Sequence, residues 1–481
     1  MEDIVIIDAL RTPIGKYRGQ LAQFSAVELG SAVSRALLAK NKKVGPLVDQ
    51  AIFGNVLQAG NGQNPARQIV INSGLAPTVY ATTVNQVCGS GMKAVSLAME
   101  AIRLQKAELI LAGGIESMSQ APFLSRYNQQ KDSYSDPVPV MIKDGLTDAF
   151  SGQHMGLTAE NVAQKFHVSR KEQDVLALYS QQKAAAAQEK GYFTAEKINL
   201  QTKEGKDINC DEGIRKATSL EKLAALKTVF KEDGTVTAGN ASTLNDGAAA
   251  MLLASKNFAL SQKLPILAEI KDIVEVGIDP SLMGISPIKA IRKLIAATEI
   301  SLADIDWFEI NEAFAASSIV VQRELALAAE KVNPVGSGIS IGHAIGATGA
   351  RIITTACHQL ERIKGRYAIA SLCVGGGLGL ACLIERPSSQ EKKHFYQMSK
   401  TQRLSQLALQ KELSQDQLKD LTQTSLNDQV ADHLIENQIS EFELPMGVAL
   451  NLRVNQKDYV VPMATEEPSV IAACSNGAKM L

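Results

Sequence analysis

The sequence is short of cysteine and of net charge. Its 481 residues include six cysteines, none of them in a CxxC pair. That spacing excludes a disulfide framework and the usual zinc-binding patterns, so we expect free thiols and no metal site. Lysine and arginine total 49 against 50 acidic residues. A chain this close to neutral lacks the field that attracts nucleic acid or an anionic membrane, so neither is an expected partner.

Long apolar runs are also missing. No stretch reaches the ~18 residues that a membrane-spanning helix needs. The amino terminus begins Met1-Glu2-Asp3, without the positive charge and apolar run of a secretory signal. The sequence therefore predicts a cytoplasmic protein, in which any anionic ligand must be held by a local basic patch.

Strand-like and helix-like segments alternate along the chain, which is typical of an α/β fold. A glycine-rich turn is twice followed by a helix and then by a buried strand. The first set is a turn over 88–91, a helix over 92–105 and a strand over 109–112; the second is 342–349, 350–359 and 367–372. This repetition predicts an internal duplication with two βαβ-type halves.

Two regions depart from this pattern. Residues 121–245 are more polar, and they include an alanine-rich helix near 180–189. After Glu385 the composition changes to linker chemistry, and the tail that follows is predicted to contain helices and extended segments. Its signals are helix starts at Ser399, Ser414 and Ser425, turns at 445–447 and 455–456, and a last helix that runs to the end of the chain.

Cys88 and His343 are the strongest candidates for chemistry. Cys88 lies just before a predicted helix, whose dipole is expected to lower the thiol pKa and favour the nucleophilic thiolate. His343 lies in the second glycine-rich turn, where a neutral imidazole could accept a thiol proton. A buried core cysteine and a capping histidine remain the alternatives for these two residues.

Further candidates lie at predicted strand ends. Cys373 precedes three glycines, and Asn311-Glu312 follows a strand over 307–310, although core packing and turn capping explain such residues equally well. Gly338–Gly342 matches the GxSxG pattern of serine hydrolases, but the histidine is too close and the helix too distant for a nucleophile elbow. The glycine runs near 336 and 375 lack the spacing of a dinucleotide-binding loop.

Taken together, four motifs over residues 1–386 resemble the thiolase family. They are Asn85–Gly91 around Cys88, Asn311–Ala315, Gly342–Gly349 around His343, and Cys373–Gly377. One departure is Ala344, where the family usually has proline, which is expected to loosen the turn without removing a reacting group. The resemblance implies a thiolase fold of duplicated αβαβα layered halves with an inserted loop domain.

The resemblance also implies a mechanism. His343 activates Cys88, which attacks acetyl-CoA and keeps the acetyl group, and Cys373 then removes a proton from a second acetyl-CoA. The enolate oxygen would be stabilised by His343 and a water on Asn311, and the other oxyanion hole would be the backbone N–H groups of Cys88 and Gly375. The carbanion attacks the acetyl group and gives acetoacetyl-CoA, without a cofactor.

The polar insertion resembles the loop domain that covers CoA in thiolases. His154 and Met155 are similar to the biosynthetic subfamily, Arg215 is the expected contact to the nucleotide end, and Ala238 and Ser242 would line the pantetheine path. The predicted segments are 1–120 for the first half, 121–245 for the loop domain, 246–265 for a return to the first half, 266–386 for the second half, 387–394 for a linker and 395–481 for the tail.

The tail resembles the beginning of a bacterial 3-hydroxy-3-methylglutaryl-CoA (HMG-CoA) reductase, as an incomplete helical and α+β segment. Val461–Ser469 matches that family's motif, with Glu467 at the catalytic glutamate. The remaining active-site residues and the nicotinamide domain are not in the sequence, so we expect no reductase activity from these 481 residues. NAD(P)H would be required only by a complete reductase domain.

The expected activity is that of an acetyl-CoA C-acetyltransferase, which condenses two acetyl-CoA molecules at the first step of the mevalonate pathway. Its partners would be acetyl-CoA, acetoacetyl-CoA and CoA, with a homodimer or homotetramer as the expected assembly. Two alternatives remain open. One is a degradative 3-ketoacyl-CoA thiolase of broader chain length, and the other is a CoA-binding scaffold without catalysis.

Overall fold

The computed structural model describes residues 2–298, 300–387, 404, 446–464 and 469–480. The chain divides into two compact units, Met1–Ser389 and Gln390–Leu481. The predicted linker over 387–394 lies almost entirely outside the described residues, as do the helix starts predicted at Ser399, Ser414 and Ser425. In the part of the chain that is described, no helix is both long and apolar enough to cross a membrane.

The first unit is built on a ten-stranded mixed sheet. Its order is β14-β15-β16-β13-β1-β12-β5-β3-β4, and β2 pairs with β12. The strands are β1 (Ile4–Arg11), β2 (Gly15–Lys16), β3 (Gln50–Gly54), β4 (Tyr80–Val84), β5 (Leu109–Ser117), β12 (Asn245–Ser255), β13 (Ala268–Gly277), β14 (Trp307–Ile310), β15 (Tyr367–Val374) and β16 (Leu378–Glu385). Both ends of the order have a parallel pair, β3 with β4 and β14 with β15.

The duplication predicted from the glycine-rich turns is visible in this topology. In each half a turn leads into a buried helix and then into a central strand: α3 (Ser90–Arg103) precedes β5, and α10 (Thr348–Ile363) precedes β15. The two halves meet where β1 pairs antiparallel with β13. Every residue of β1, β5 and β12 is buried, as expected for strands covered by helices on both faces.

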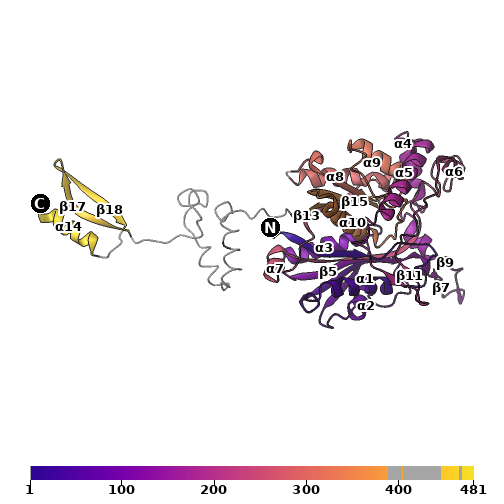
Figure 1. Ribbon diagram of the computed structural model, residues 1–481, viewed down its shortest axis with the longest axis horizontal. Coiled ribbons are helices and arrows are strands. Elements are labelled where there is room, and N and C mark those ends of the chain that lie inside the picture. The colour runs from indigo at the N-terminus through magenta and orange to yellow at the C-terminus, as the bar shows by residue number, and fades with distance from the viewer. Residues whose placement is uncertain (1, 299, 388–403, 405–445, 465–468, 481) are drawn as a thin grey trace. The chain divides into compact units, whose positions relative to one another are not determined.

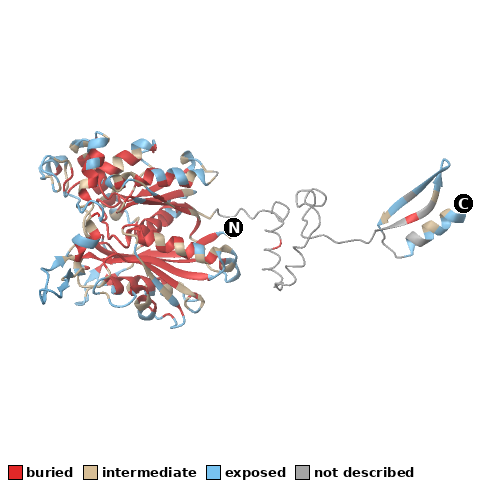
Figure 2. Ribbon diagram, turned by 180° about the vertical axis from the view of Figure 1, so that it is seen from behind, coloured by how far each residue is buried: buried red, intermediate tan, exposed pale blue. Residues whose placement is uncertain are grey.

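Helices form the remaining layers (Figure 1). α3 and α10 lie in the middle, in the largest apolar core. α1 (Ala26–Lys40) and α2 (Pro65–Asn72) cover one outer face, and α8 (Ser286–Ala296) and α9 (Ala315–Glu324) cover the other. Figure 2 shows the buried residues concentrated in the sheet and in these central helices. The two halves of the continuous sheet pack on either side of α3 and α10, which gives the order helix, sheet, helix, sheet, helix that the resemblance implies.

The insertion between β5 and β12 contains short hairpins, α4 (Gly156–Lys165), α5 (Arg170–Glu189) and α6 (Leu220–Ala224). The alanine-rich helix predicted near 180–189 is the second half of α5. Sequence periodicity missed the start of α5, where Ser169 and Glu172 form a capping box. The remaining short elements of the first unit are β6 (Phe123–Leu124), β7 (Tyr127–Asn128), β8 (Ser133–Tyr134), β9 (Val138–Pro139), β10 (Leu200–Gln201), β11 (Asp207–Ile208) and α7 (Lys256–Ser261).

The described part of the second unit is a hairpin followed by a helix. β17 (Met446–Val454) pairs with β18 (Lys457–Ala464), and α14 (Val470–Met480) follows. The predicted turn at Asn455-Gln456 is confirmed, since both residues have φ near +60° as a two-residue hairpin turn requires. The turn predicted at 445–447 is wrong for Met446 and Gly447, because both belong to β17. Glu467 lies outside the described residues.

Candidate active site

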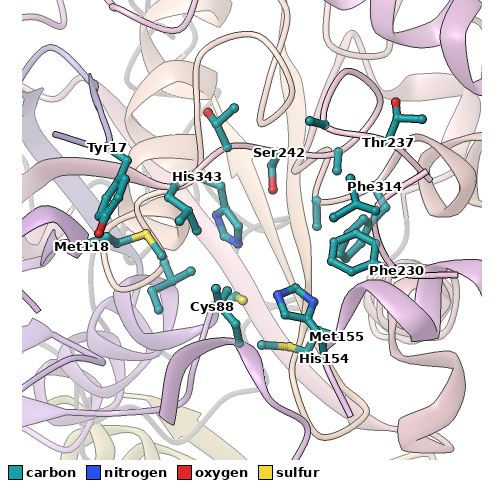
Figure 3. A pocket seen from close by; sticks show the side chains of 18 of the residues that line it. Tyr17, Cys88, Met118, His154, Met155, Phe230, Thr237, Ser242, Phe314 and His343 are labelled. Carbon is teal, nitrogen blue, oxygen red and sulfur yellow. The ribbon is translucent and has the colours of Figure 1, made fainter. Parts of the chain in front are cut away.

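One cavity of about 520 Å³ opens among the predicted catalytic residues. Its volume suits a small-molecule site. Cys88, His343 and Cys373 all line it, together with five of the predicted substrate contacts (Figure 3). Those five are His154, Met155, Arg215, Ala238 and Ser242; other lining residues include Lys16, Tyr17, Met118, Phe230, Met283 and Phe314.

Two glycine contacts bring the cysteine and histidine turns together. A Cβ atom on Gly91 would lie 2.7 Å from the backbone nitrogen of Ala350, and one on Gly349 would lie 2.3 Å from that of Met92. The amino-terminal ends of α3 and α10 therefore touch through backbone atoms, which any side chain would separate. This close packing places Cys88 and His343 at one pocket although 255 positions separate them in the sequence.

Cys88 is buried at the start of α3, and its sulfur accepts a hydrogen bond from the backbone N–H of Gly375. Burial raises the pKa of its thiol to about 11, and the hydrogen bond from Gly375 only partly offsets that effect. The prediction that the helix dipole lowers this pKa is therefore wrong for the substrate-free protein, because loss of water around the sulfur outweighs the dipole. The resting side chain is a neutral thiol.

His343 is held in one orientation and one tautomer. Its backbone N–H donates to Asn245 Oδ1 at 2.9 Å, and its Nδ1 lies 2.7 Å from Thr348 Oγ1. The Thr348 hydroxyl donates its single proton to the carbonyl of Ala344 at 2.9 Å, so it accepts from Nδ1–H; the amide nitrogen of Asn311, also a donor, is 3.5 Å from Nδ1, beyond the usual hydrogen-bond distance. Nε2 is thus left as the basic nitrogen, and burial lowers the pKa of His343 to about 3, so the imidazole is neutral as predicted.

The histidine turn is well closed despite Ala344. The carbonyl of Ala344 accepts from the backbone N–H groups of Ala347 and Thr348, each at 2.9 Å, and from the Thr348 hydroxyl. The expected loosening is therefore not observed. Three donors on one carbonyl hold the turn that proline would otherwise restrict.

Cys373 lies at the end of β15, buried next to the first sulfur. Burial, with a smaller contribution from the nearby Cys88, raises the pKa of its thiol to about 12. A Cβ on Gly375 would lie 3.0 Å from the Met155 sulfur, so the loop after Cys373 approaches the pocket closely only because this residue is glycine. The two sulfurs predicted to cooperate therefore belong to residues that line the same cavity.

Asn311 and Gly375 do not line the cavity themselves. Asn311 is buried behind His343, with Nδ2 at 3.5 Å from Nδ1 of the histidine, and its Oδ1 has no hydrogen-bond partner within the described residues. Ser340 of the GxSxG pattern is buried and bonded to Ser180 Oγ at 2.8 Å. That serine is remote from any helix start, so the hydrolase alternative lacks its nucleophile elbow.

His154 forms an aromatic wall that the sequence does not reveal. Its ring stacks on Phe230, with centroids 4.6 Å apart and planes inclined by 23°. Its Nδ1 accepts from the Gly156 N–H at 3.0 Å, and burial lowers its pKa, so the neutral ring carries its proton on Nε2. Arg215 of the insertion lines the same cavity, whereas the ammonium of Lys222 donates to the carbonyl of Ala217 at 2.6 Å.

Sequence reasoning missed a carboxylate beneath the site. Glu116 accepts hydrogen bonds from the backbone N–H groups of Val56, Leu57 and Gly346 and from Asn55 Nδ2, at 2.8 to 3.2 Å. It therefore ties the histidine turn to the loop after β3. Burial raises the pKa of Glu116 to about 8. The only signal available in sequence was an acidic residue inside an otherwise apolar strand. Among the described residues no cluster of His, Cys, Asp or Glu is suited to a metal ion.

Comparison with known proteins agrees with this geometry. Residues 4–257 match the family model "Thiolase, N-terminal domain", and 264–386 match "Thiolase, C-terminal domain". The acetyl-CoA acetyltransferase of Escherichia coli is 47% identical over 395 residues, which cover 80% of this chain and 100% of that protein. The chain therefore belongs to the thiolase family.

Solved structures support the same assignment. The acetyl-CoA acetyltransferase of Bacillus anthracis has a TM-score of 0.78 and 40% identity, covering 80% of this chain and 99% of that one. The human mitochondrial 3-ketoacyl-CoA thiolase in complex with CoA has a TM-score of 0.77 and 39% identity, covering 80% and 98%. The chain is accordingly an acyltransferase. Its residues 400–481 match the family model for hydroxymethylglutaryl-coenzyme A reductase, as the resemblance of the tail predicts.

Proposed function

We propose that this thiolase condenses two acetyl-CoA molecules into acetoacetyl-CoA and CoA, as the first step of the mevalonate pathway in the cytoplasm. The observation that carries the proposal is a single cavity lined by Cys88, Cys373 and the neutral imidazole of His343. The pathway assignment is supported by the reductase match of the tail, because HMG-CoA reductase acts later on products of acetoacetyl-CoA.

The first half-reaction transfers an acetyl group to Cys88. His343 Nε2 takes the thiol proton as the sulfur attacks the thioester carbonyl, and the backbone N–H groups of Cys88 and Gly375 stabilise the oxyanion. Cys373 gives its proton to the departing CoA sulfur and becomes a thiolate. Because the pKa values of both cysteine thiols are raised, proton transfer that accompanies sulfur attack is favoured over a thiolate that persists in the free enzyme.

The second half-reaction forms the carbon–carbon bond. The Cys373 thiolate removes a proton from the methyl group of the second acetyl-CoA, and the enolate oxygen is stabilised by protonated His343 and a water on Asn311. The carbanion attacks the acetyl-Cys88 carbonyl, and Cys88 leaves with the proton returned by His343. Each side chain ends in its starting protonation state, so no cofactor is consumed.

Thr348 is expected to matter through the tautomer of His343. Thr348→Val keeps the shape but removes the hydroxyl that accepts from Nδ1–H, so the opposite tautomer becomes populated and Nε2 loses its basic lone pair. We expect kcat to fall about tenfold to a hundredfold, with KM for acetyl-CoA little changed. Steady-state kinetics test this, and Thr348→Ser, which retains a hydroxyl, is the matched control. Equal losses in both variants would exclude the tautomer role.

Met155, Met283 and Phe314 form a small apolar cluster next to Cys373 and close the cavity beside the reacting sulfurs. This limited space supports acetyl transfer over the degradative alternative, whose longer acyl chains need more room. In Met155→Ala we expect kcat/KM for 3-ketohexanoyl-CoA to rise about tenfold relative to kcat/KM for acetoacetyl-CoA. The reason is that a difference of one methylene group in a hydrophobic pocket changes substrate discrimination by about 1–3 kcal/mol. Met141→Ala, which alters a methionine outside the cavity lining, is the control. An unchanged ratio would show that Met155 does not limit chain length.

An assembly of at least two copies is part of the proposal. β4 is the edge strand of the large sheet, and five exposed apolar side chains lie on the hairpins after β5: Phe123, Leu124, Tyr127, Tyr134 and Val138. Unpaired strand edges and exposed aromatic residues favour association.

The proposed function itself is tested by incubating the whole chain with acetyl-CoA alone. Formation of acetoacetyl-CoA and CoA in equal amounts supports it, and turnover restricted to longer 3-ketoacyl-CoA substrates would favour the degradative alternative.

A further inference from the structure

One cation at the active-site cavity, Lys16, lies outside the four thiolase motifs and was not among the predicted site residues. Lys16 lines the cavity together with Arg215, and these two residues are the only lysine or arginine side chains among its described lining residues. The histidines do not add charge, because burial lowers the pKa values of His154 and His343. Lys16 comes from β2 in the first half, whereas Arg215 comes from the insertion.

The backbone of Lys16 is tied to the catalytic centre. Lys16 pairs with Asn245 in the sheet, and the next residue, Tyr17, donates its backbone N–H to the carbonyl of Leu244 at 2.9 Å. The side chain of Asn245 then spans both parts of the site. Its Nδ2 donates to the carbonyl of Gly15 at 2.9 Å, and its Oδ1 accepts from the backbone N–H of His343 at 2.9 Å. These contacts fix the backbone of Lys16 relative to His343.

The ammonium of Lys16 has one long ion pair and remains accessible to a ligand. Its side chain is 61% exposed, and its nearest carboxylate, Glu212, is 3.7 Å away. The Glu212 side chain already accepts from the backbone N–H groups of Lys16 and Gln20, at 3.1 and 3.0 Å. Within the described residues the ammonium donates no hydrogen bond, which leaves its three donors for a ligand. Glu212 limits the movement of the Lys16 side chain but accepts no hydrogen bond from its ammonium group.

We propose that Lys16, together with Arg215, binds the phosphate groups of CoA and so selects phosphate-bearing thioesters over simple thioesters. The inference rests on the proposed function. CoA thioesters carry several negative charges at the end remote from the acyl group, and a chain with net charge −1 must supply the matching cations locally. Two cations from different segments of the chain are positioned to do so, and the motifs include neither.

The test compares Lys16→Met with the unaltered chain on two substrates, acetyl-CoA and acetyl-pantetheine, which has the same reacting end but no phosphate. We expect the ratio of KM for acetyl-CoA to KM for acetyl-pantetheine to rise about fivefold to tenfold, the effect of one charge-assisted contact to phosphate. The acetyl-pantetheine reaction serves as an internal measure of folding, because a damaged enzyme would lose both activities together.

Lys40→Met is the matched control. Lys40 is 52% exposed and pairs with Asp8 at 2.8 Å in the same half, so it reproduces the loss of one charge and one ion pair outside the cavity. An unchanged KM ratio in Lys16→Met, or an equal change in Lys40→Met, would overturn the assignment. These failures differ from failure of the proposed function, in which the unaltered chain would form neither acetoacetyl-CoA from acetyl-CoA nor acetoacetyl-pantetheine from acetyl-pantetheine.

Discussion

Cys88→Ser is expected to lower kcat for acetoacetyl-CoA synthesis by about four orders of magnitude or more. Loss of a covalent nucleophile has effects of this size. A serine hydroxyl is far less acidic than a thiol, and the burial that already raises the Cys88 pKa to about 11 would disfavour an alkoxide still more. The measurement is initial rate in both directions, synthesis from acetyl-CoA and cleavage of acetoacetyl-CoA.

The control for that substitution is Cys210→Ser. Cys210 is an exposed free cysteine in the insertion and does not line the cavity, so its variant should retain full activity. If Cys88→Ser kept more than about one hundredth of the original rate, with Cys210→Ser unaffected, a covalent step on Cys88 would no longer explain catalysis.

Cys373→Ser is expected to separate the two half-reactions. The acetyl group should still reach Cys88, at a rate lowered only by loss of the acid that protonates the departing CoA sulfur, because the nucleophile, His343 Nε2 and the Gly375 N–H all remain. Condensation should fall by about three orders of magnitude, since the hydroxyl cannot act as the base that takes the methyl proton. Rapid mixing with acetyl-CoA would then give a burst of about one CoA per chain followed by almost no turnover.

Two results of the same experiment would contradict this role of Cys373. If acetylation fell as far as condensation in Cys373→Ser, Cys373 would be as essential to CoA release as to proton removal, or would only support the pocket, and the two half-reactions would not separate. If condensation persisted near its original rate, another group would be the base. Because Cys373 is fully buried beside Cys88, intact acetylation in this variant also reports that the local packing survives the change.

Much of the fold was predictable because periodicity and glycine spacing report local structure directly. The strand predicted over 307–310 is β14, and the helices predicted after the two glycine-rich turns are α3 and α10, each displaced by two residues at its start and by two or four residues at its end. Apolar spacing identifies a helix well but its ends poorly, because Ser90 and Thr348 begin helices with no side-chain cap. The tail turn predicted at 445–447 is wrong for Met446 and Gly447 because they begin a strand, and glycine does not exclude a strand.

The candidate site was predictable in its residues but not in its electrostatics. Cys88, His343 and Cys373 each follow a pattern in the sequence, and the structure places them at one cavity. The sign of the Cys88 pKa shift was not predictable, because it depends on burial by parts of the chain far away in sequence. Lys16, Glu116 and Phe230 were missed for the same reason. Each acquires its position only when distant strands pair or distant rings stack.

The account depends most directly on where the acetyl group is held. The decisive measurement is peptide mass analysis of the protein quenched in acid after brief exposure to acetyl-CoA. We predict one acetyl group, about 42 Da, on the peptide that contains Cys88, formed also in Cys373→Ser and absent from Cys88→Ser. An active protein with no adduct on Cys88, or with the acetyl group on Cys373 or Cys210 instead, would contradict the account.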